Sequence, residues 1–259
     1  LESIGQYAFA KSNFPKFEIP NSVTEIGKYA FSSCPKLVSI KFGSGFKTLS
    51  EGALSDCSAL KDIQLQEGLT TIGDAAFANC TALESITIPA SVTAIGSTAS
   101  WDSHTQSGTY LPFYRCTALK SVVFEDGNSD ITLTWHNYYG ASNSAYHRGM
   151  FKDCPLEEVY IGRNIKYKQN SRYTFEVYPH AYGYSAFYNQ PKLTKITIGE
   201  TVTEITPYLF YNNASITLMA LPNVAKIGKA AFRGCSKLTT LNLGKSLTCL
   251  LYTSPSPRD

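Results

Sequence analysis

Apolar and polar positions along this chain follow a pattern that returns about every 23 residues. The consensus of the pattern is L-x-x-I-x-I-P-x-x-V-T-x-I-G-x-x-A-F-x-x-C. Spacings of 22, 23, 23, 36, 38, 36, 23 and 22 residues separate the apolar anchors of its A-F-x-x-C block, which are Phe9, Phe31, Leu54, Phe77, Phe113, Phe151, Phe187, Phe210 and Phe232. A short fixed period predicts a solenoid, because each unit can bury its apolar side chains only by stacking on its neighbours.

Within one unit, the L-x-x-I-x-I segment alternates apolar and polar residues, which predicts a short strand with one buried face. A proline such as Pro89 often follows and ends the strand, since it has no N–H for a ladder. The V-T-x-I segment then returns the chain to the core, and a glycine such as Gly96 permits a turn. A single isolated repeat is not expected to fold.

The V-T-x-I-G and A-F-x-x-C blocks, as in residues 92–96 and 76–80, resemble those of the BspA-like leucine-rich repeat family of bacterial and protozoan surface proteins. The resemblance implies an α/β repeat solenoid with short parallel β-strands on its concave face. About nine repeats of 22–23 residues, three of them with insertions, would form one domain over residues 1–248. The resemblance also implies an exported or cell-surface protein that mediates adhesion to host, matrix or cell-surface partners.

The three long spacings indicate insertions at about 97–110, 127–146 and 167–184. Each falls in the same part of its repeat, so stacking should bring the three to one flank. Tyrosine and tryptophan favour recognition surfaces, because they offer large, fairly rigid contact area with a polar group. The candidate ligand-binding residues are seven aromatic residues of the insertions and one outward strand residue: Trp101, Trp135, Tyr138, Tyr139, Tyr173, Tyr178, Tyr182 and Tyr160. The same rings would also suit a packed side lobe, and the sequence leaves both interpretations open.

Six cysteines share one repeat position: Cys34, Cys57, Cys80, Cys116, Cys154 and Cys235. Neither a metal site nor a disulfide framework has this spacing. Gln190 and Asn213 fill the same position in two other repeats. The pattern therefore predicts a ladder of small buried side chains inside the coil.

The net charge is +3, and no basic stripe is present, so nucleic-acid binding is not expected. No stretch approaches 18 apolar residues, so no membrane span is expected in this chain. The chain also lacks the phosphate-loop, dinucleotide, zinc-protease and nucleophile-elbow motifs. We therefore expect no catalytic residues, no cofactor and no metal, and a surface position for each histidine.

Residues 249–259 depart from the repeat at Cys249 and resemble a translated sequencing adapter. They are expected to be a non-native, disordered tail on part of a longer protein. The sequence as a whole predicts a non-catalytic interaction module whose partner is a protein or a glycan. Two alternatives remain open, a glycan-binding accessory module of a larger enzyme and a structural spacer.

Overall fold

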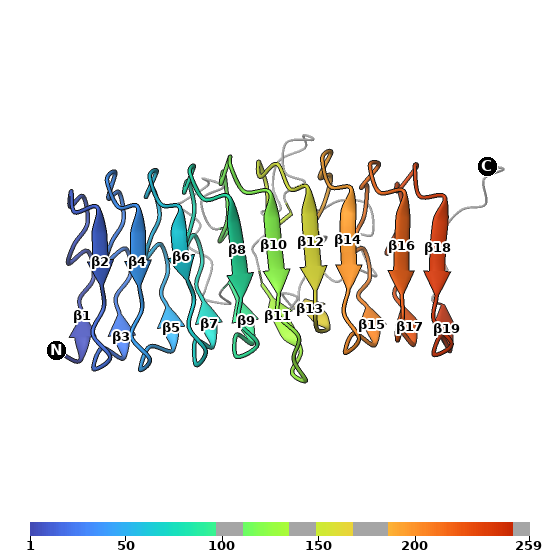
Figure 1. Ribbon diagram of the computed structural model, residues 1–259, viewed down its shortest axis with the longest axis horizontal. Helices are drawn as coiled ribbons and strands as arrows, with labels where there is room; N and C mark the ends of the chain where they lie inside the picture. Colours follow the sequence, from blue (N-terminus) through green and yellow to red (C-terminus); the bar gives the residue numbers. More distant parts are fainter. Residues whose placement is uncertain (97–110, 135–148, 168–185, 251–259) are drawn as a thin grey trace, which may run out of the picture.

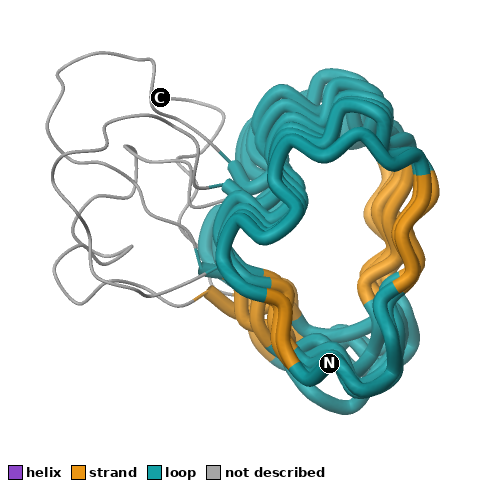
Figure 2. Tube along the Cα trace, turned by 90° about the vertical axis from the view of Figure 1, so that its left-hand side faces the viewer, coloured by secondary structure: helices purple, strands orange, loops and turns teal. Residues whose placement is uncertain are grey.

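The computed structural model describes residues 1–96, 111–134, 149–167 and 186–250, and in these the chain forms a stack of coils. A coil contains a longer strand, a corner and a shorter strand, and the strands pair in parallel with equivalent strands of neighbouring coils, with interruptions in both rows (Figure 1). Viewed along the stack, the two rows of strands occupy different sides of one ring, and turns close the ring between them (Figure 2). The predicted repeat solenoid of short parallel strands is therefore confirmed.

The longer strands are hydrogen-bonded in three groups. Their bounds are β2 (Lys16–Glu18), β4 (Ser39–Lys41) and β6 (Asp62–Gln64); β8 (Ser85–Ile88), β10 (Ser121–Phe124), β12 (Glu158–Ile161) and β14 (Lys195–Ile198); β16 (Leu218–Leu221) and β18 (Thr240–Leu243). Alternate side chains point inward, as in β8, where Ile86 and Ile88 are buried and Ser85 and Thr87 are exposed. This alternation is the one that the L-x-x-I-x-I pattern predicts.

The shorter strands form a second row in two hydrogen-bonded groups. Their bounds are β1 (Ser3–Ile4), β3 (Glu25–Ile26), β5 (Thr48–Leu49), β7 (Thr71–Ile72), β9 (Ala94–Ile95), β11 (Ile131–Leu133) and β13 (Ile165–Tyr167); β15 (Glu204–Ile205), β17 (Lys226–Ile227) and β19 (Cys249–Leu250).

Three expected boundaries are corrected by this row. Tyr167 had been assigned to an insertion, but it is the last residue of β13 and pairs with Leu133 of β11. Residues 127–134 had been assigned to an insertion, but Thr132 and Leu133 of β11 pair with Ala94 and Ile95 of β9, so they belong to the coil. Cys249 and Leu250 had been assigned to a tail outside the repeat, but β19 pairs with β17. Leu250 pairs with Ile227 and so holds the register position of isoleucine in other coils, although it is 61% exposed at the end of the described stack; the repeat therefore continues through Leu250.

The third side of each coil is made of turns, and the described residues contain no helix. The described residues therefore lack the helices that the expected α/β class includes. The backbone conformation of the turns explains this difference. Residues two positions before and two after an anchor adopt positive φ, as Ala75 (50°) and Asn79 (60°) do around Phe77. Left-handed residues at this spacing cannot belong to a right-handed α-helix.

Main-chain hydrogen bonds nevertheless join these turns from coil to coil. The N–H of Phe31 donates to the carbonyl of Ala53 (2.9 Å), and the N–H of Ser33 donates to that of Ser55 (2.7 Å). The N–H of Ser32, between them, donates within its own turn, to Tyr29. Half of the donors of each turn therefore need a neighbouring coil, which explains physically why an isolated repeat should not fold.

The anchors form a continuous column through the core. Phe77, Phe113, Phe151 and Phe187 stack with ring centroids 5.1–5.4 Å apart. The column crosses places where the sequence period lengthens, since the N–H of Phe77 donates to the carbonyl of Pro112 (2.9 Å). The longer repeats thus keep the coil-to-coil register of the shorter ones.

The shared cysteine position forms a second column, confirming the predicted ladder of buried side chains. Its six thiols are free and buried. Each donates to the carbonyl oxygen of the anchor in the preceding coil, with Cys80 Sγ 3.2 Å from the oxygen of Leu54. Gln190 and Asn213 donate to Phe151 and Phe187 in the same way.

Arg163, in the corner between β12 and β13, is fully buried. Three residues separate β12 from β13, whereas six separate β10 from β11. Arg163 packs over Gly127 of the longer corner, and its guanidinium donates to the carbonyls of Pro89 (2.6 Å) and Ala90. Burial lowers the pKa of this guanidinium. The charges of Glu125 and Glu67 act in the opposite direction but do not cancel the effect of burial. One side chain therefore joins three successive coils.

Side chains bridge the interruption of the shorter row between β13 and β15. The side-chain oxygen of Asn164 accepts the N–H groups of Thr203 (2.9 Å) and Glu204 (3.1 Å). In regular coils a main-chain carbonyl has this role, as that of Thr70 does for Thr93 and Ala94. The carboxylate of Glu204 lies between Lys166 (2.5 Å) and Lys226 (3.3 Å). We call this group the seam.

Candidate functional site

The outward side chains of the longer strands form one continuous surface, which we call the strand face. Strand register places them in two rows, one at the first strand position and one at the third. Ser121 is paired with Glu158 and Val123 with Tyr160, and β14 continues both rows with Lys195 and Thr197. Because parallel strands lie about 4.8 Å apart, neighbours in a row are close enough to contact one partner together.

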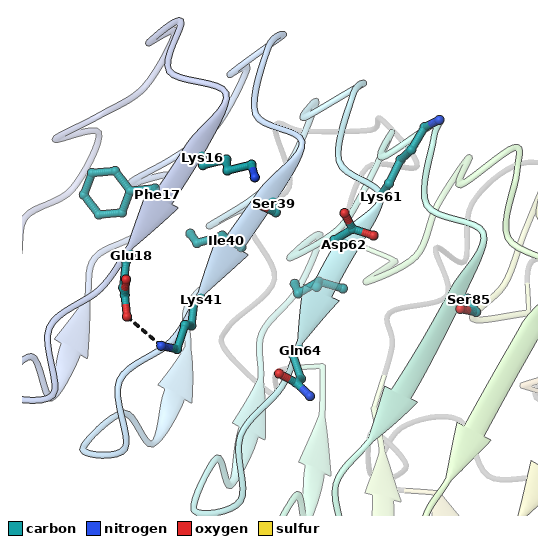
Figure 3. Close-up of a pocket in the computed structure, with 11 residues that line it drawn as sticks. Lys16, Phe17, Glu18, Ser39, Ile40, Lys41, Lys61, Asp62, Gln64 and Ser85 are labelled. Atoms are coloured by element: carbon teal, nitrogen blue, oxygen red, sulfur yellow. Dashed lines mark hydrogen bonds and ion pairs between the residues drawn. The ribbon is translucent and has the colours of Figure 1, made fainter.

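The first part of the strand face holds a hollow of about 720 Å³ across β2, β4 and β6. Ser39 and Ser85 have short side chains, which leave room between the longer side chains around them (Figure 3). Lys16 and Asp62 stand beside Ser39, with Lys61 at the same end of the strands. Glu18, Lys41 and Gln64 lie at the other end.

The ionisable groups of this hollow are only partly paired. Lys41 Nζ lies 2.7 Å from Glu18 Oε1. Lys16, Lys61 and Asp62 lie at the other end of the hollow. Among the described residues, none of these three side chains has an ion-pair partner within 4.0 Å. These three charges are exposed to solvent and available to a ligand.

The central part of the strand face neutralises its own charges. Glu158 accepts hydrogen bonds from Lys195 Nζ (3.0 Å) and Ser121 Oγ (3.1 Å). These hydrogen bonds and the charge of Lys195 lower the pKa of Glu158. Lys120 and Glu157 form a looser pair at 3.8 Å.

Tyr160 is the one predicted ligand-binding residue that lies within the described part of the chain. It is half-buried at a third strand position, and its hydroxyl donates to the carboxylate of Asp126, 2.8 Å from Oδ1 and 2.9 Å from Oδ2. This hydrogen bond, with burial, raises the pKa of Tyr160. The ring is therefore held in place on the strand face. The other seven candidates lie outside the described residues: Trp101, Trp135, Tyr138, Tyr139, Tyr173, Tyr178 and Tyr182.

The third-position row is uncharged from β8 onward. It consists of Thr87, Val123, Tyr160, Thr197, Ala220 and Asn242. Beside it, Leu218 at the first position of β16 is 54% exposed. Leu218 is not among the ligand-binding residues predicted from the sequence. An apolar residue at an outward strand position is the signal that was available.

A second hollow of about 580 Å³ lies along the shorter row, over β5, β7 and β9. It is lined by threonines such as Thr48 and Thr71 together with Glu51 and Asp74. Over the described part of the chain, no group of three histidine, cysteine, aspartate or glutamate residues is placed to hold a metal ion. In the same residues, no helix has the length and apolarity to cross a membrane.

Comparison with known proteins supports the repeat assignment. The sequence profile of the BspA type leucine rich repeat region matches residues 1–107 and 174–253, in six copies. No curated protein sequence matches the chain.

Two solved structures show the same fold. A leucine-rich repeat protein from Bacteroides ovatus ATCC 8483 has 26% identity and a TM-score of 0.56, over 96% of this chain and 60% of that one. The leucine rich repeat protein of T. pallidum has 20% identity and a TM-score of 0.50, over 91% of this chain and 82% of that one. The chain thus spans less than two thirds of the Bacteroides protein.

Proposed function

The chain belongs to the BspA type leucine-rich repeat family, and on this premise we propose that it is a non-catalytic module that binds a protein partner on its strand face. The observation that carries the proposal is the continuous exposed surface of the longer strands. Main-chain pairing holds the strands of this surface in place within each of its three groups, so a partner meets a largely preorganised backbone and binding requires little ordering of the protein.

Tyr160 and Leu218 are the proposed anchors of this interface. Tyrosine is enriched among residues that dominate binding energy, and an exposed leucine gains free energy when a partner covers it. Around these residues the third-position row is uncharged and the charges of Glu158 and Lys195 are paired with each other. A partner can therefore cover Glu158 and Lys195 as an existing ion pair, while the carboxylate of Asp126 keeps its hydrogen bond from Tyr160.

The proposed setting is adhesion outside the cell or at its surface, to host, matrix or cell-surface proteins. The resemblance to BspA-like surface proteins supports this location. An antibody against the chain should label intact cells of the producing organism. Labelling that requires permeabilised cells would contradict the location while leaving the binding proposal untouched.

The aromatic residues of the insertions are proposed as a second contact area. Binding of the 259-residue chain to arrays of extracellular matrix proteins and of glycans tests both areas. A Tyr160→Ala/Leu218→Glu variant disrupts the strand face, and a Trp101→Ala/Trp135→Ala variant disrupts the insertions. Thr93→Glu is the matched control, because it adds one negative charge at an exposed residue that directly precedes β9, away from the strand face.

We expect a protein ligand whose binding falls at least tenfold in the strand-face variant and stays unchanged in Thr93→Glu. Loss only in the tryptophan variant would move the site to the insertions. Glycan binding alone would replace this proposal with the accessory-module alternative. A folded chain that binds neither class would favour a structural spacer.

A further inference from the structure

The hollow over β2, β4 and β6 differs from the rest of the strand face in its unpaired charge. Its lining contains three lysines, Lys16, Lys41 and Lys61, and two carboxylates, those of Glu18 and Asp62. The pair between Lys41 and Glu18 removes one charge of each sign. What remains at the other end of the hollow is two free amines and one free carboxylate, an excess of one positive charge.

The dimensions of the hollow suit an extended polypeptide. Lys16 and Lys61 lie on or next to strands two positions apart in the row, so their backbones are about 10 Å apart at the usual strand spacing. An extended chain covers this span with about three residues. Ser39 lies between the two lysines, and its short side chain leaves room for the incoming segment (Figure 3).

We propose that this hollow binds an acidic segment of the protein partner, which places a carboxylate against Lys16 and Lys61. Charge complementarity supports this choice: two lysine amines without intramolecular ion pairs among the described residues, and only one free carboxylate, lie at the same end of the hollow. Asp62 opposes an acidic ligand, so its charge limits the affinity. The inference rests on the proposed function and adds to it the chemistry of one subsite.

Opposing substitutions test the sign of the charge that the hollow selects. The probes are fluorescein-labelled hexaglutamate, hexalysine, an uncharged Gly-Ser hexapeptide and a hexagalacturonate oligosaccharide, with fluorescence anisotropy measured on the full chain. For hexaglutamate, Lys16→Gln and Lys61→Gln should each weaken binding about fivefold, the range of an exposed charge pair. Asp62→Asn should strengthen it by a similar factor. Raising the salt concentration should weaken binding to the wild type.

Lys192→Gln is the matched control, because it removes the same charge from an exposed turn outside the hollow. Equal weakening in this variant would overturn the inference, since only net charge would then matter. Tighter binding of hexalysine or of the uncharged peptide than of hexaglutamate would also overturn the inference, because the hollow would then not select negative charge. Binding of hexagalacturonate without hexaglutamate would overturn it in favour of an acidic glycan.

The array experiment with Tyr160→Ala/Leu218→Glu separates this inference from the proposed function. Protein binding that depends on those anchors, with no response of hexaglutamate to the hollow variants, would overturn the acidic subsite alone. The reverse result, hexaglutamate binding with the expected signs and no protein ligand on the arrays, would support the subsite and contradict the proposed function. All of these side chains are exposed or half-buried, and circular dichroism of each variant checks that it remains folded.

Discussion

The side-chain amide of Asn213 donates to the carbonyl oxygen of Phe187 at 2.8 Å, across the boundary between two coils. The oxygen of the same amide accepts the N–H of Gln190 at 2.9 Å. In six other coils the equivalent contact to an anchor carbonyl comes from a cysteine thiol, for example from Cys116 to Phe77 at 3.1 Å. The repeat position thus requires a small buried donor, whether S–H or N–H.

Substitution of Asn213 should be among the more destabilising changes in the core. Asn213→Ala leaves the carbonyl of Phe187 and the N–H of Gln190 without these partners, which we expect to cost about 3 kcal/mol of unfolding free energy. Urea denaturation measures the change, with the exposed Asn128→Ala as a control expected within about 0.5 kcal/mol. A loss below about 1 kcal/mol for Asn213→Ala would show that these hydrogen bonds contribute little net stability.

Cys80 tests the same position with a thiol. Cys80→Ala removes the donor to Leu54 and leaves a small cavity, so we expect a loss of about 1–2 kcal/mol. Cys80→Ser keeps a donor of similar size and should lose less than the alanine variant. Urea denaturation of the two variants gives the order, and a serine variant less stable than alanine would contradict the donor role. Burial raises the pKa of the Cys80 thiol to about 12, so it should react with thiol reagents only after unfolding.

Arg163 should be needed for stability, because it joins coils that are not adjacent. Arg163→Ala removes its hydrogen bonds to the carbonyls of Pro89 and Ala90, with an expected loss of about 3 kcal/mol. Arg163→Lys retains a charge but cannot form the same forked contact, so an intermediate loss is expected. Thermal unfolding compares the two variants. A stability for Arg163→Ala equal to the wild type would show that the buried guanidinium brings no net gain.

The seam gives a defined pH dependence. Burial acts to raise the pKa of Glu204, but hydrogen bonds and charges from Lys166 and Lys226 outweigh it and lower the pKa. A lowered carboxyl pKa stabilises the fold above the unfolded value of about 4.3, and this stability is lost as the pH falls through the folded value. Glu204→Gln should therefore be about 1 kcal/mol less stable than the wild type at pH 7. The difference should close below about pH 4, and a constant difference from pH 7 to pH 3 would contradict this.

Tyr160→Phe separates the hydroxyl from the ring. Losing the hydrogen bond to Asp126 should cost at most about 1 kcal/mol, because the group is only half-buried. The raised pKa of Tyr160 means that this stability is present below about pH 10 and is lost as the pH rises through the folded value. Urea denaturation at pH 7 and pH 11 measures both expectations. Partner binding should survive Tyr160→Phe and fall in Tyr160→Ala if the ring is the anchor; equal losses would assign the role to the hydroxyl.

The sequence by itself determined the repeating part of this protein. The period of the anchors, the alternation around residues such as Ile86, and the shared position of Cys34 and Cys80 specified strands, core and ladder. Each of these features depends on burial within one coil and its immediate neighbours. Local apolar spacing is therefore enough to determine them.

The tertiary structure decided what the repeats do not share. Arg163 is buried only because a three-residue corner lies beside a six-residue one, and Asn164 replaces a main-chain carbonyl only where the shorter row is interrupted. The paired charges of Glu158 and the free amines of Lys16 and Lys61 depend likewise on which side chains become neighbours across coils. Such contacts join residues that are 23 to 74 positions apart in the sequence. Their geometry depends on how the coils stack and on the lengths of the corners. The apolar pattern of a single repeat does not encode either of these.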